Sequence, residues 1–192
     1  MGREFELKYA ADAASMAAAE KDFPDGKIYR METTYYDVPS RTLSRRHWTL
    51  RRRLENGISV CTLKTPCLDG GRGEWETECA DLLDAVPALI SLGAPGELAA
   101  LTAEGVLPIC GAQFTRRAVT LEWGDSVLEL AMDQGTLLGG GREQPLREIE
   151  VELKQGSDEA AIAFGQLLAA RYGLHPEKKS KFRRAKDLAE GK

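Results

Sequence analysis

Regular alternation of charged and apolar side chains is the feature that most constrains the fold of this chain. Near its start, Glu4, Glu6 and Lys8 alternate with Phe5 and Leu7. Because successive side chains of a β-strand point to opposite faces, this pattern predicts a strand with one charged and one apolar face. A single strand of this kind is typical of a solvated surface, so its meaning depends on how often the pattern recurs.

The pattern recurs along much of the chain, and turn signals separate the repeats. The dipeptide Asn56-Gly57 is a strong hairpin signal between two such segments. The predicted strands lie at residues 4–8, 27–37, 48–54, 58–65, 72–79, 109–122, 126–133, 135–141 and 146–154. About eight strands with short turns predict a single antiparallel sheet that curls or closes.

Helical segments interrupt this series of strands. Asp81 and Ser157 are typical N-cap residues, and Gly173 is a typical helix stop. The predicted helices lie at residues 11–22, 81–92, 95–101, 157–172 and 178–190. Two arrangements remain open for the charged strand faces. Either they look outward to water, or the sheet closes around them and the helices cover its apolar outer face.

Length and composition exclude several classes of protein. With 192 residues and a net charge of -4, the chain is large enough for one domain and lacks the bulk positive charge of many nucleic-acid-binding proteins. The four cysteines form no CxxC pair and only two histidines occur, which argues against a zinc site and favours a reduced, cytoplasmic protein. Acidic residues near the start argue against a secretory signal, and no apolar run reaches the ~18 residues of a membrane helix. We therefore expect no nucleic-acid partner and no membrane partner.

The charges on the shared face indicate what a closed sheet would contain. Since each buried ion costs several kcal/mol, an interior of this kind must be solvated and its charges compensated. Glu148, Glu150 and Glu152 would repel one another without a cation, and Mg²⁺ prefers carboxylate oxygens. Arg51 and Arg53 suit bidentate binding of phosphate, and no GxxxxGK[ST] loop is present to bind it instead. A polyphosphate bridged to a metal would satisfy both sets of charges.

A series of short motifs occurs in order along the chain. It begins with Glu4-x-Glu6-x-Lys8 and ends with Ser180-Lys181. Between them lie Tyr35-Tyr36-Asp37, Leu50-Arg51-x-Arg53, Lys64 in a TLK, Arg72-x-Glu74-x-Glu76, Arg116, Asp133 in a Met-Asp-Gln-Gly and Glu148-x-Glu150-x-Glu152. This order resembles the signature motifs of the CYTH superfamily, the triphosphate tunnel metalloenzymes. The later acidic segments are most similar to those of its bacterial inorganic triphosphatases.

The resemblance implies a fold and a reaction. The fold would be α+β and dominated by β, an eight-stranded antiparallel closed tunnel, or barrel, with helices packed outside, formed by a single domain over residues 1–192. The reaction would be the metal-dependent hydrolysis of inorganic triphosphate to diphosphate and phosphate inside the tunnel. Mg²⁺ or Mn²⁺ would be the cofactor, and the protein would act as a monomer or a homodimer.

The resemblance also implies a set of site residues. The expected substrate-binding residues are Lys8, Arg51, Arg53, Lys64, Arg72, Arg116, Lys181 and Arg184. The expected metal ligands are Glu4, Glu6, Asp133, Glu148, Glu150 and Glu152. The expected catalytic residues are Glu4, Glu6 and Lys8.

Other interpretations remain open at this stage. The same fold could belong to a thiamine triphosphatase or a class IV adenylate cyclase. However, the sequence contains no clear element that would recognise the adenine base of a nucleotide. A non-catalytic module that binds polyphosphate or nucleotide is a further alternative. Glu74 and Glu76 are expected to orient neighbouring arginines, whereas Trp48, Trp75 and Trp123 are expected to be packing residues. The glycines at 140–141 and the segment 95–107 receive no functional assignment.

Overall fold

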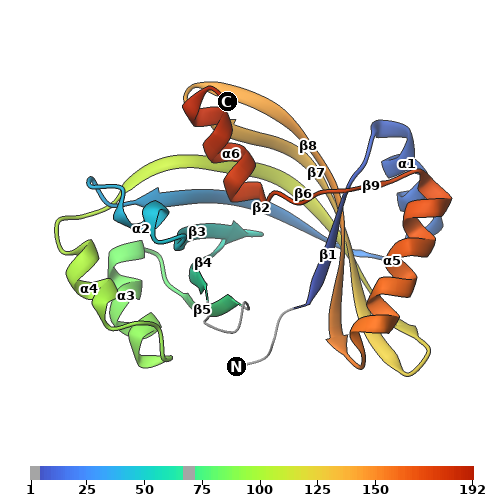
Figure 1. Cartoon of the computed structure of the whole chain (residues 1–192), viewed down its shortest axis with the longest axis horizontal. Helices are drawn as coiled ribbons and strands as arrows, with labels where there is room; N and C mark the ends of the chain where they lie inside the picture. The colour runs from blue at the N-terminus through green and yellow to red at the C-terminus, as the bar shows by residue number, and fades with distance from the viewer. Residues whose placement is uncertain (1–4, 67–71) are drawn as a thin grey trace.

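One large antiparallel sheet dominates the fold (Figure 1). The computed structural model describes residues 5–66 and 72–192, and for Arg72 it describes the backbone alone. Within these residues the strands are β1 Glu6–Ala10, β2 Lys27–Asp37, β3 Thr49–Glu55, β4 Ile58–Pro66, β5 Arg72–Glu78, β6 Leu107–Trp123, β7 Ser126–Gly139, β8 Arg142–Gln155 and β9 His175–Pro176. Their order across the sheet is β5-β4-β3-β2-β6-β7-β8-β1-β9, and every neighbouring pair is antiparallel.

The sheet has nine strands and is not closed, so the prediction of a closed eight-stranded tunnel is wrong in these two respects. It is strongly curved, but no ladder in the described part of the chain joins β5 to β1 or β9. The short strand β9 accounts for part of this difference. It pairs with Tyr9 and Ala10, and the Glu177 amide donates to the Lys8 carbonyl at 2.8 Å. These contacts use the edge of β1 that a closing strand would need.

Six helices complete the described part of the chain. They are α1 Ala13–Asp22, α2 Thr42–Arg45, α3 Leu82–Ser91, α4 Glu97–Thr102, α5 Asp158–Tyr172 and α6 Lys181–Glu190. The helices predicted at 81–92 and 157–172 are confirmed, with side chains of Asp81 and Ser157 accepting hydrogen bonds from backbone amides of the first turn. The predicted strand at 135–141 is instead the end of β7, which continues through Asp133 to Gly139.

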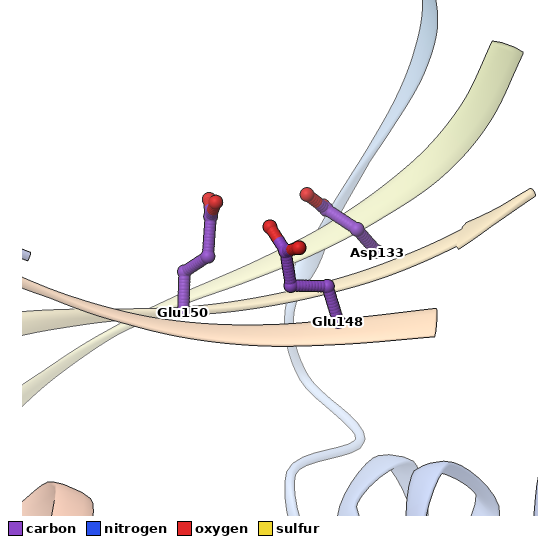
Figure 2. A group of neighbouring side chains, drawn as sticks. All are labelled: Asp133, Glu148 and Glu150. Carbon is purple, nitrogen blue, oxygen red and sulfur yellow. The ribbon is translucent and has the colours of Figure 1, made fainter. Parts of the chain in front are cut away.

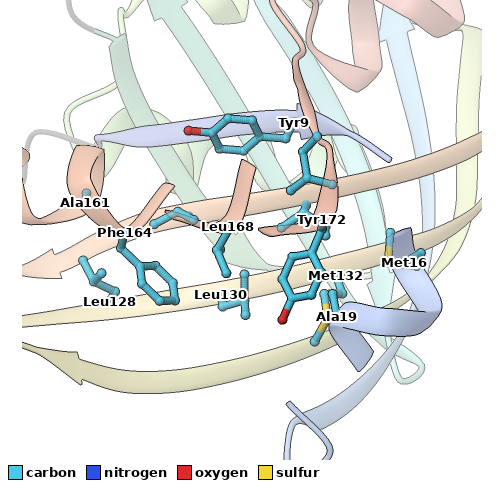
Figure 3. Close-up of a cluster of buried hydrophobic side chains, with 13 residues drawn as sticks. Tyr9, Met16, Ala19, Leu128, Leu130, Met132, Ala161, Phe164, Leu168 and Tyr172 are labelled. Atoms are coloured by element: carbon cyan, nitrogen blue, oxygen red, sulfur yellow. The ribbon is translucent and has the colours of Figure 1, made fainter. Parts of the chain in front are cut away.

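The convex face of β1, β7 and β8 is covered by α1 and α5 (Figure 3). Apolar residues that alternate with the charged ones, such as Leu130 and Val151, are fully buried there with Phe164 and Leu168 of α5. Trp123 packs at the edge of this cluster. The period-two pattern of these strands therefore separates an apolar outer face from a charged inner one.

A second apolar cluster covers the other half of the convex face. Leu50 and Leu63 of β3 and β4 are fully buried against α2, α3 and α4. Trp48 is buried in the same cluster, and the partly buried Trp75 packs against it. The packing role predicted for the three tryptophans is thus confirmed. Within the segment 95–107, which the sequence left unassigned, Leu98 of α4 belongs to this core.

The aspartate of the Tyr-Tyr-Asp motif has a structural role. Asp37 is fully buried, and its carboxylate accepts hydrogen bonds from the amides of Val38, Leu43 and Ser44 at 2.8–3.1 Å. These bonds satisfy amides in and before the first turn of α2, which connects β2 to β3.

Helix α6 lies on the inner face of the sheet, so the expectation that all helices pack outside is also wrong. Its residues Phe182 and Ala185 pack against Tyr35 and Phe114, whose side chains belong to the concave face. A Cβ atom at Gly139 would lie only 2.4 Å from the Ala185 carbonyl oxygen, so this close approach requires glycine. The helix thereby brings the chain segment that begins at Ser180 into the concavity.

Candidate active site

The concave face encloses a cavity of about 570 Å³ lined mainly by charged side chains. Strands from both halves of the sheet and the first residues of α6 contribute to its wall. Of the predicted site residues, those that line it are Glu6, Lys8, Arg51, Arg53, Lys64, Arg116, Glu150, Glu152 and Lys181. Glu4 and the side chain of Arg72 lie outside the described part of the chain. The structure therefore brings together residues that are more than 170 positions apart in sequence.

Three of the predicted metal ligands form a compact group at the cavity floor, where Glu150 reaches the surface of the cavity, and we call this group the buried acid trio. Asp133, Glu148 and Glu150 come from the adjacent strands β7 and β8 and point to the same side of the sheet (Figure 2). Each offers a carboxylate oxygen, and these oxygens lie within 4.8 Å of one another. Asp133 and Glu148 are fully buried, so such a group requires strong compensation.

Protein cations already provide that compensation. Lys181 Nζ lies 2.9 Å from Asp133 Oδ2 and 2.8 Å from Glu150 Oε1, and it also contacts Glu148. Arg116 donates two parallel hydrogen bonds of 2.8 Å to Asp133 and a third to Glu150. Arg184 Nη1 donates to Glu148 Oε2 at 2.9 Å. Three carboxylates are thus matched by three cationic side chains, all of which were predicted to bind phosphate.

The network perturbs the acidity of its members in opposite directions. Burial raises the pKa of Glu148 to about 7, and the nearby Glu150 adds to this while Lys181 opposes it. Burial also acts to raise the pKa of Glu150, but Lys181 and Arg116 together hold it well below its ordinary value. The pKa of Lys181 is raised despite its burial, since Glu150, Asp133 and Glu148 favour its charged form. Lys181 is therefore a permanent cation at the cavity wall.

A second group of carboxylates lies nearer the solvent, and we call it the outer acid row. Glu129 on β7 is directly opposite Glu152 on β8, which is directly opposite Glu6 on β1. Their side chains remain 23%, 28% and 29% exposed. Lys154 Nζ lies 2.8 Å from Glu152 Oε1 and 3.7 Å from Glu129 Oε1. Lys8 Nζ lies 2.7 Å from Glu6 Oε1.

The opposite side of the cavity is basic, and we call Arg51, Arg53 and Lys64 the basic wall. Strands β3 and β4 direct these side chains inward, while Arg52 points to the other face and bonds to Ser59. Glu74 contacts Lys64 at 2.8 Å and Arg51 at 3.5 Å, in agreement with the predicted orienting role of that glutamate.

The basic wall keeps an unsatisfied hydrogen-bond donor, although Glu74 pairs with two of its cations and Glu55 Oε1 lies 3.2 Å from Arg53 Nη1. Arg51 Nε is buried and has no hydrogen-bond acceptor among the described residues. Burial lowers the pKa of Arg53, and repulsion from Arg51 and Arg116 lowers it further. An anion with several oxygens would satisfy the unpaired donor and relieve the repulsion.

The cavity residues that were not predicted as site residues include the charged residues Glu129 and Lys154. Glu129 shares the charged face of Asp133, which is a sequence signal for its orientation. Its position opposite Glu152 depends on strand register, which a single sequence does not fix. Lys154 lies two residues after the acidic motif and was placed only at the end of a predicted strand.

These features define a class of protein: a curved antiparallel sheet whose cavity combines a basic wall for anions with carboxylates that suit hard divalent cations. The chain belongs to the CYTH domain family, which matches residues 2–185. It is 30% identical over 153 residues to an inorganic triphosphatase of Haemophilus influenzae, an alignment that covers 79% of this chain and 44% of that relative. The chain thus spans less than half the length of this curated relative.

Solved structures share the fold over nearly the whole chain. A candidate adenylyl cyclase of Hippeastrum with a dominant triphosphatase activity matches with a TM-score of 0.66 and 16% identity, covering 100% of this chain and 97% of that one. A Pyrococcus horikoshii protein matches with a TM-score of 0.63 and 22% identity, covering 98% and 99%. A candidate adenylate cyclase of Bacillus halodurans matches with a TM-score of 0.62 and 17% identity, covering 96% and 98%. At these identities the likeness concerns the fold alone.

Among the described helices, none combines the length and the apolar character that crossing a membrane requires.

Proposed function

We propose that this chain hydrolyses inorganic triphosphate to diphosphate and phosphate in a reaction that depends on Mg²⁺ or Mn²⁺. The observation that carries the proposal is the meeting of the basic wall and the outer acid row around one cavity. A triphosphate carries several negative charges along a short chain, so it needs cationic side chains and a metal at the same time. The similarity to an inorganic triphosphatase supports this choice of substrate.

The basic wall is the proposed binding site for the phosphate chain. Arg51 and Arg53 offer planar guanidinium groups that bind phosphate oxygens in pairs, and Lys64 adds a point charge beside them. The unpaired Nε of Arg51 is a donor that a phosphate oxygen would satisfy. Arg72 is a further proposed phosphate-binding residue, and its side chain lies outside the described part of the chain.

The outer acid row is the proposed ligand set of the metal. Glu6 and Glu152 are predicted ligands, Glu129 lies directly opposite Glu152, and Glu4 is expected two residues before Glu6. Like charges placed directly opposite one another repel, and carboxylate oxygens are the ligands that hard divalent cations prefer, so the chemistry of these residues suits the metal. Their oxygens are less tightly grouped than those of the buried acid trio, so the proposal requires these side chains to converge on the metal when it binds. A divalent cation bound there would neutralise charge on the phosphate oxygens as a Lewis acid.

The buried acid trio receives a different role in this proposal. Since its three carboxylates already have Arg116, Lys181 and Arg184 as partners, we assign them to holding these cations in place. Arg116 and Lys181 both line the cavity and would face the substrate from the floor. Asp133 and Glu148 then act on the reaction through these two side chains, whereas Glu150 holds them and also lines the cavity itself.

The protein's own part in the chemistry is to bind, orient and stabilise charge. Arg51, Arg53 and Lys64 would hold the phosphate chain for in-line attack by water and stabilise the charge that spreads over the transferred phosphoryl group. Glu6 would orient the attacking water by accepting its hydrogen bond. Burial disfavours the charge of Lys8, yet the adjacent Glu6 raises its pKa, so Lys8 stays protonated beside the reacting group.

A hydrolysis panel tests the proposal. Purified protein would be given inorganic triphosphate, thiamine triphosphate and ATP with Mg²⁺, with Mn²⁺ and with EDTA, and the products separated by chromatography. We expect the highest kcat/KM for inorganic triphosphate and no turnover with EDTA. Three outcomes would contradict the proposal. Faster release of phosphate from thiamine triphosphate would favour a thiamine triphosphatase, and cyclic AMP as the main product would favour an adenylate cyclase. Tight binding of triphosphate without turnover would favour a non-catalytic binding module.

A further inference from the structure

Lys154 sits in an irregular position at the end of the outer acid row. In the ladder between β7 and β8, Leu128 pairs with Leu153 and Val127 pairs with Gln155, so Lys154 is the extra residue of a β-bulge. Bulges of this kind redirect a side chain and often lie beside active sites. Here the bulge accompanies a Lys154 side chain that lines the cavity and reaches Glu152 and Glu129.

The ammonium group of Lys154 uses the same oxygens that a divalent cation would need. Its Nζ lies 2.8 Å from Glu152 Oε1, which is ion-pair distance, and 3.7 Å from Glu129 Oε1. A metal bound to these carboxylates would bring two positive charges close to the ammonium group. The two cations therefore repel each other at that site, and their binding is antagonistic.

We propose that Lys154 is an internal competitor of the metal, which occupies the outer acid row in the metal-free protein and leaves it when the metal binds. This inference rests on the proposed metal-dependent function, and it adds a residue that sets the metal concentration at which the site fills. Without the metal, Lys154 compensates the repulsion between Glu152 and Glu129. With the metal, that compensation is no longer needed.

A comparison with Lys181 shows why Lys154 can leave. The side chain of Lys181 is 9% exposed and contacts three carboxylates, so moving it would leave several buried charges without a compensating cation. The side chain of Lys154 is 40% exposed and lines the cavity. A lysine carries its charge on a flexible, well-hydrated stem, so rotation toward solvent removes the ammonium group at little cost.

Isothermal titration of Mn²⁺ and of Mg²⁺ into the substrate-free protein tests the competition directly. The variants are Lys154→Met and Lys154→Gln, and Lys21→Met is the matched control, since it removes the same charge from α1 outside the cavity. Circular dichroism verifies that each variant is folded. Because the metal must displace a half-exposed and therefore weak ion pair, we expect both Lys154 variants to bind either metal about two- to fivefold more tightly than wild type. Lys21→Met should bind as wild type does.

The outcomes separate this inference from the function on which it rests. Equal or weaker metal binding by the Lys154 variants, with clear binding by wild type, overturns the competition and leaves the proposed function intact. A raised KM for triphosphate with unchanged metal affinity also overturns it, because Lys154 would then be a substrate contact. Absence of metal binding to every folded variant at millimolar Mn²⁺ overturns both proposals.

Discussion

The buried acid trio and the outer acid row contain the same kinds of residue on the same strands, yet they differ in burial and in partners. Glu150 and Glu152 are only two positions apart on one face of β8. Glu150 contacts Arg116 and Lys181, whereas Glu152 contacts only the half-exposed Lys154 among the ion pairs of the described residues. The difference teaches that alternate glutamates of one acidic strand motif can have different environments, which the cations opposite each residue determine.

The largest expected effect is on stability, and it comes from the buried side of this comparison. Lys181→Met removes the cation that contacts all three carboxylates of the buried acid trio. Because breaking a buried ion pair leaves an uncompensated charge, we expect the free energy of unfolding to fall by about 3–5 kcal/mol. Urea denaturation at pH 7 measures this value.

Lys179→Met is the control for that measurement. Lys179 pairs with Asp187 at 2.8 Å, but its side chain is 58% exposed, so its loss should cost less than about 1 kcal/mol. If Lys181→Met were as stable as Lys179→Met, the trio would not depend on Lys181 for its charge balance.

The next effect is on activity and comes from the outer acid row. Glu152→Gln keeps the shape of the side chain but removes a proposed metal ligand. We expect kcat/KM for triphosphate to fall by about 100-fold or more, while the midpoint of urea denaturation stays close to that of wild type. The matched control is Glu143→Gln, the same exchange at an exposed position of β8 outside the cavity. If Glu152→Gln had wild-type kinetics, the outer acid row would not be the metal site.

A smaller effect on activity is expected from the basic wall, where neighbouring arginines face opposite ways. Arg51→Ala should lower kcat/KM by about 10- to 100-fold, because a charge-assisted phosphate contact is worth roughly 1.5–3 kcal/mol. Arg52→Ala removes the same side chain from the convex face, where it bonds to Ser59 at 2.9 Å. Steady-state kinetics on both variants decide the matter. If both variants lost the same factor in kcat/KM, the loss in Arg51→Ala would not be due to a contact that Arg51 makes inside the cavity.

The smallest expected effect is a dependence of stability on pH that belongs to the buried acid trio. Burial raises the pKa of Glu148 to about 7, so in the folded protein its neutral form is favoured at lower pH. The stability that this raised pKa provides is fully present below the unfolded value and is lost as the pH rises through 7. Between pH 6 and pH 8 the loss is at most about 1.4 kcal/mol for one proton. Urea denaturation of wild type and Glu148→Gln should show this slope only in wild type, and parallel profiles would refute it.

Much of the fold follows from local patterns in the sequence. The period of two in residues such as Leu50 to Arg53 assigns each side chain to a face, and the faces are as expected, since Leu50 is buried outside while Arg51 and Arg53 line the cavity. The caps at Asp81 and Ser157 also fix the starts of α3 and α5. These features depend on near neighbours in the chain, which is why a single sequence reveals them.

The features that escaped prediction depend on contacts between distant segments. The location of α6 inside the curve depends on close packing between Gly139 and Ala185. The separation of Glu150 from Glu152 into different networks depends on which cations lie opposite, and Lys181 reaches Glu150 from a helix 31 positions later. The failure of the sheet to close depends in part on β9, a strand of two residues that is too short to show a sequence pattern. None of these has a periodic signal.

The location of Lys181 in the first turn of α6 has a consequence for biosynthesis. Translation proceeds from the N-terminus, so Asp133, Glu148 and Glu150 emerge from the ribosome before the lysine that neutralises them. Until that helix docks, Arg116 is the one cationic partner among the described residues already present for Asp133 and Glu150, and Glu148 lacks both Lys181 and Arg184, so water must hydrate this part of the interior. Maturation of the cavity is therefore one of the last events in the formation of this protein, and a nascent chain arrested before residue 181 would have a sheet without a working site.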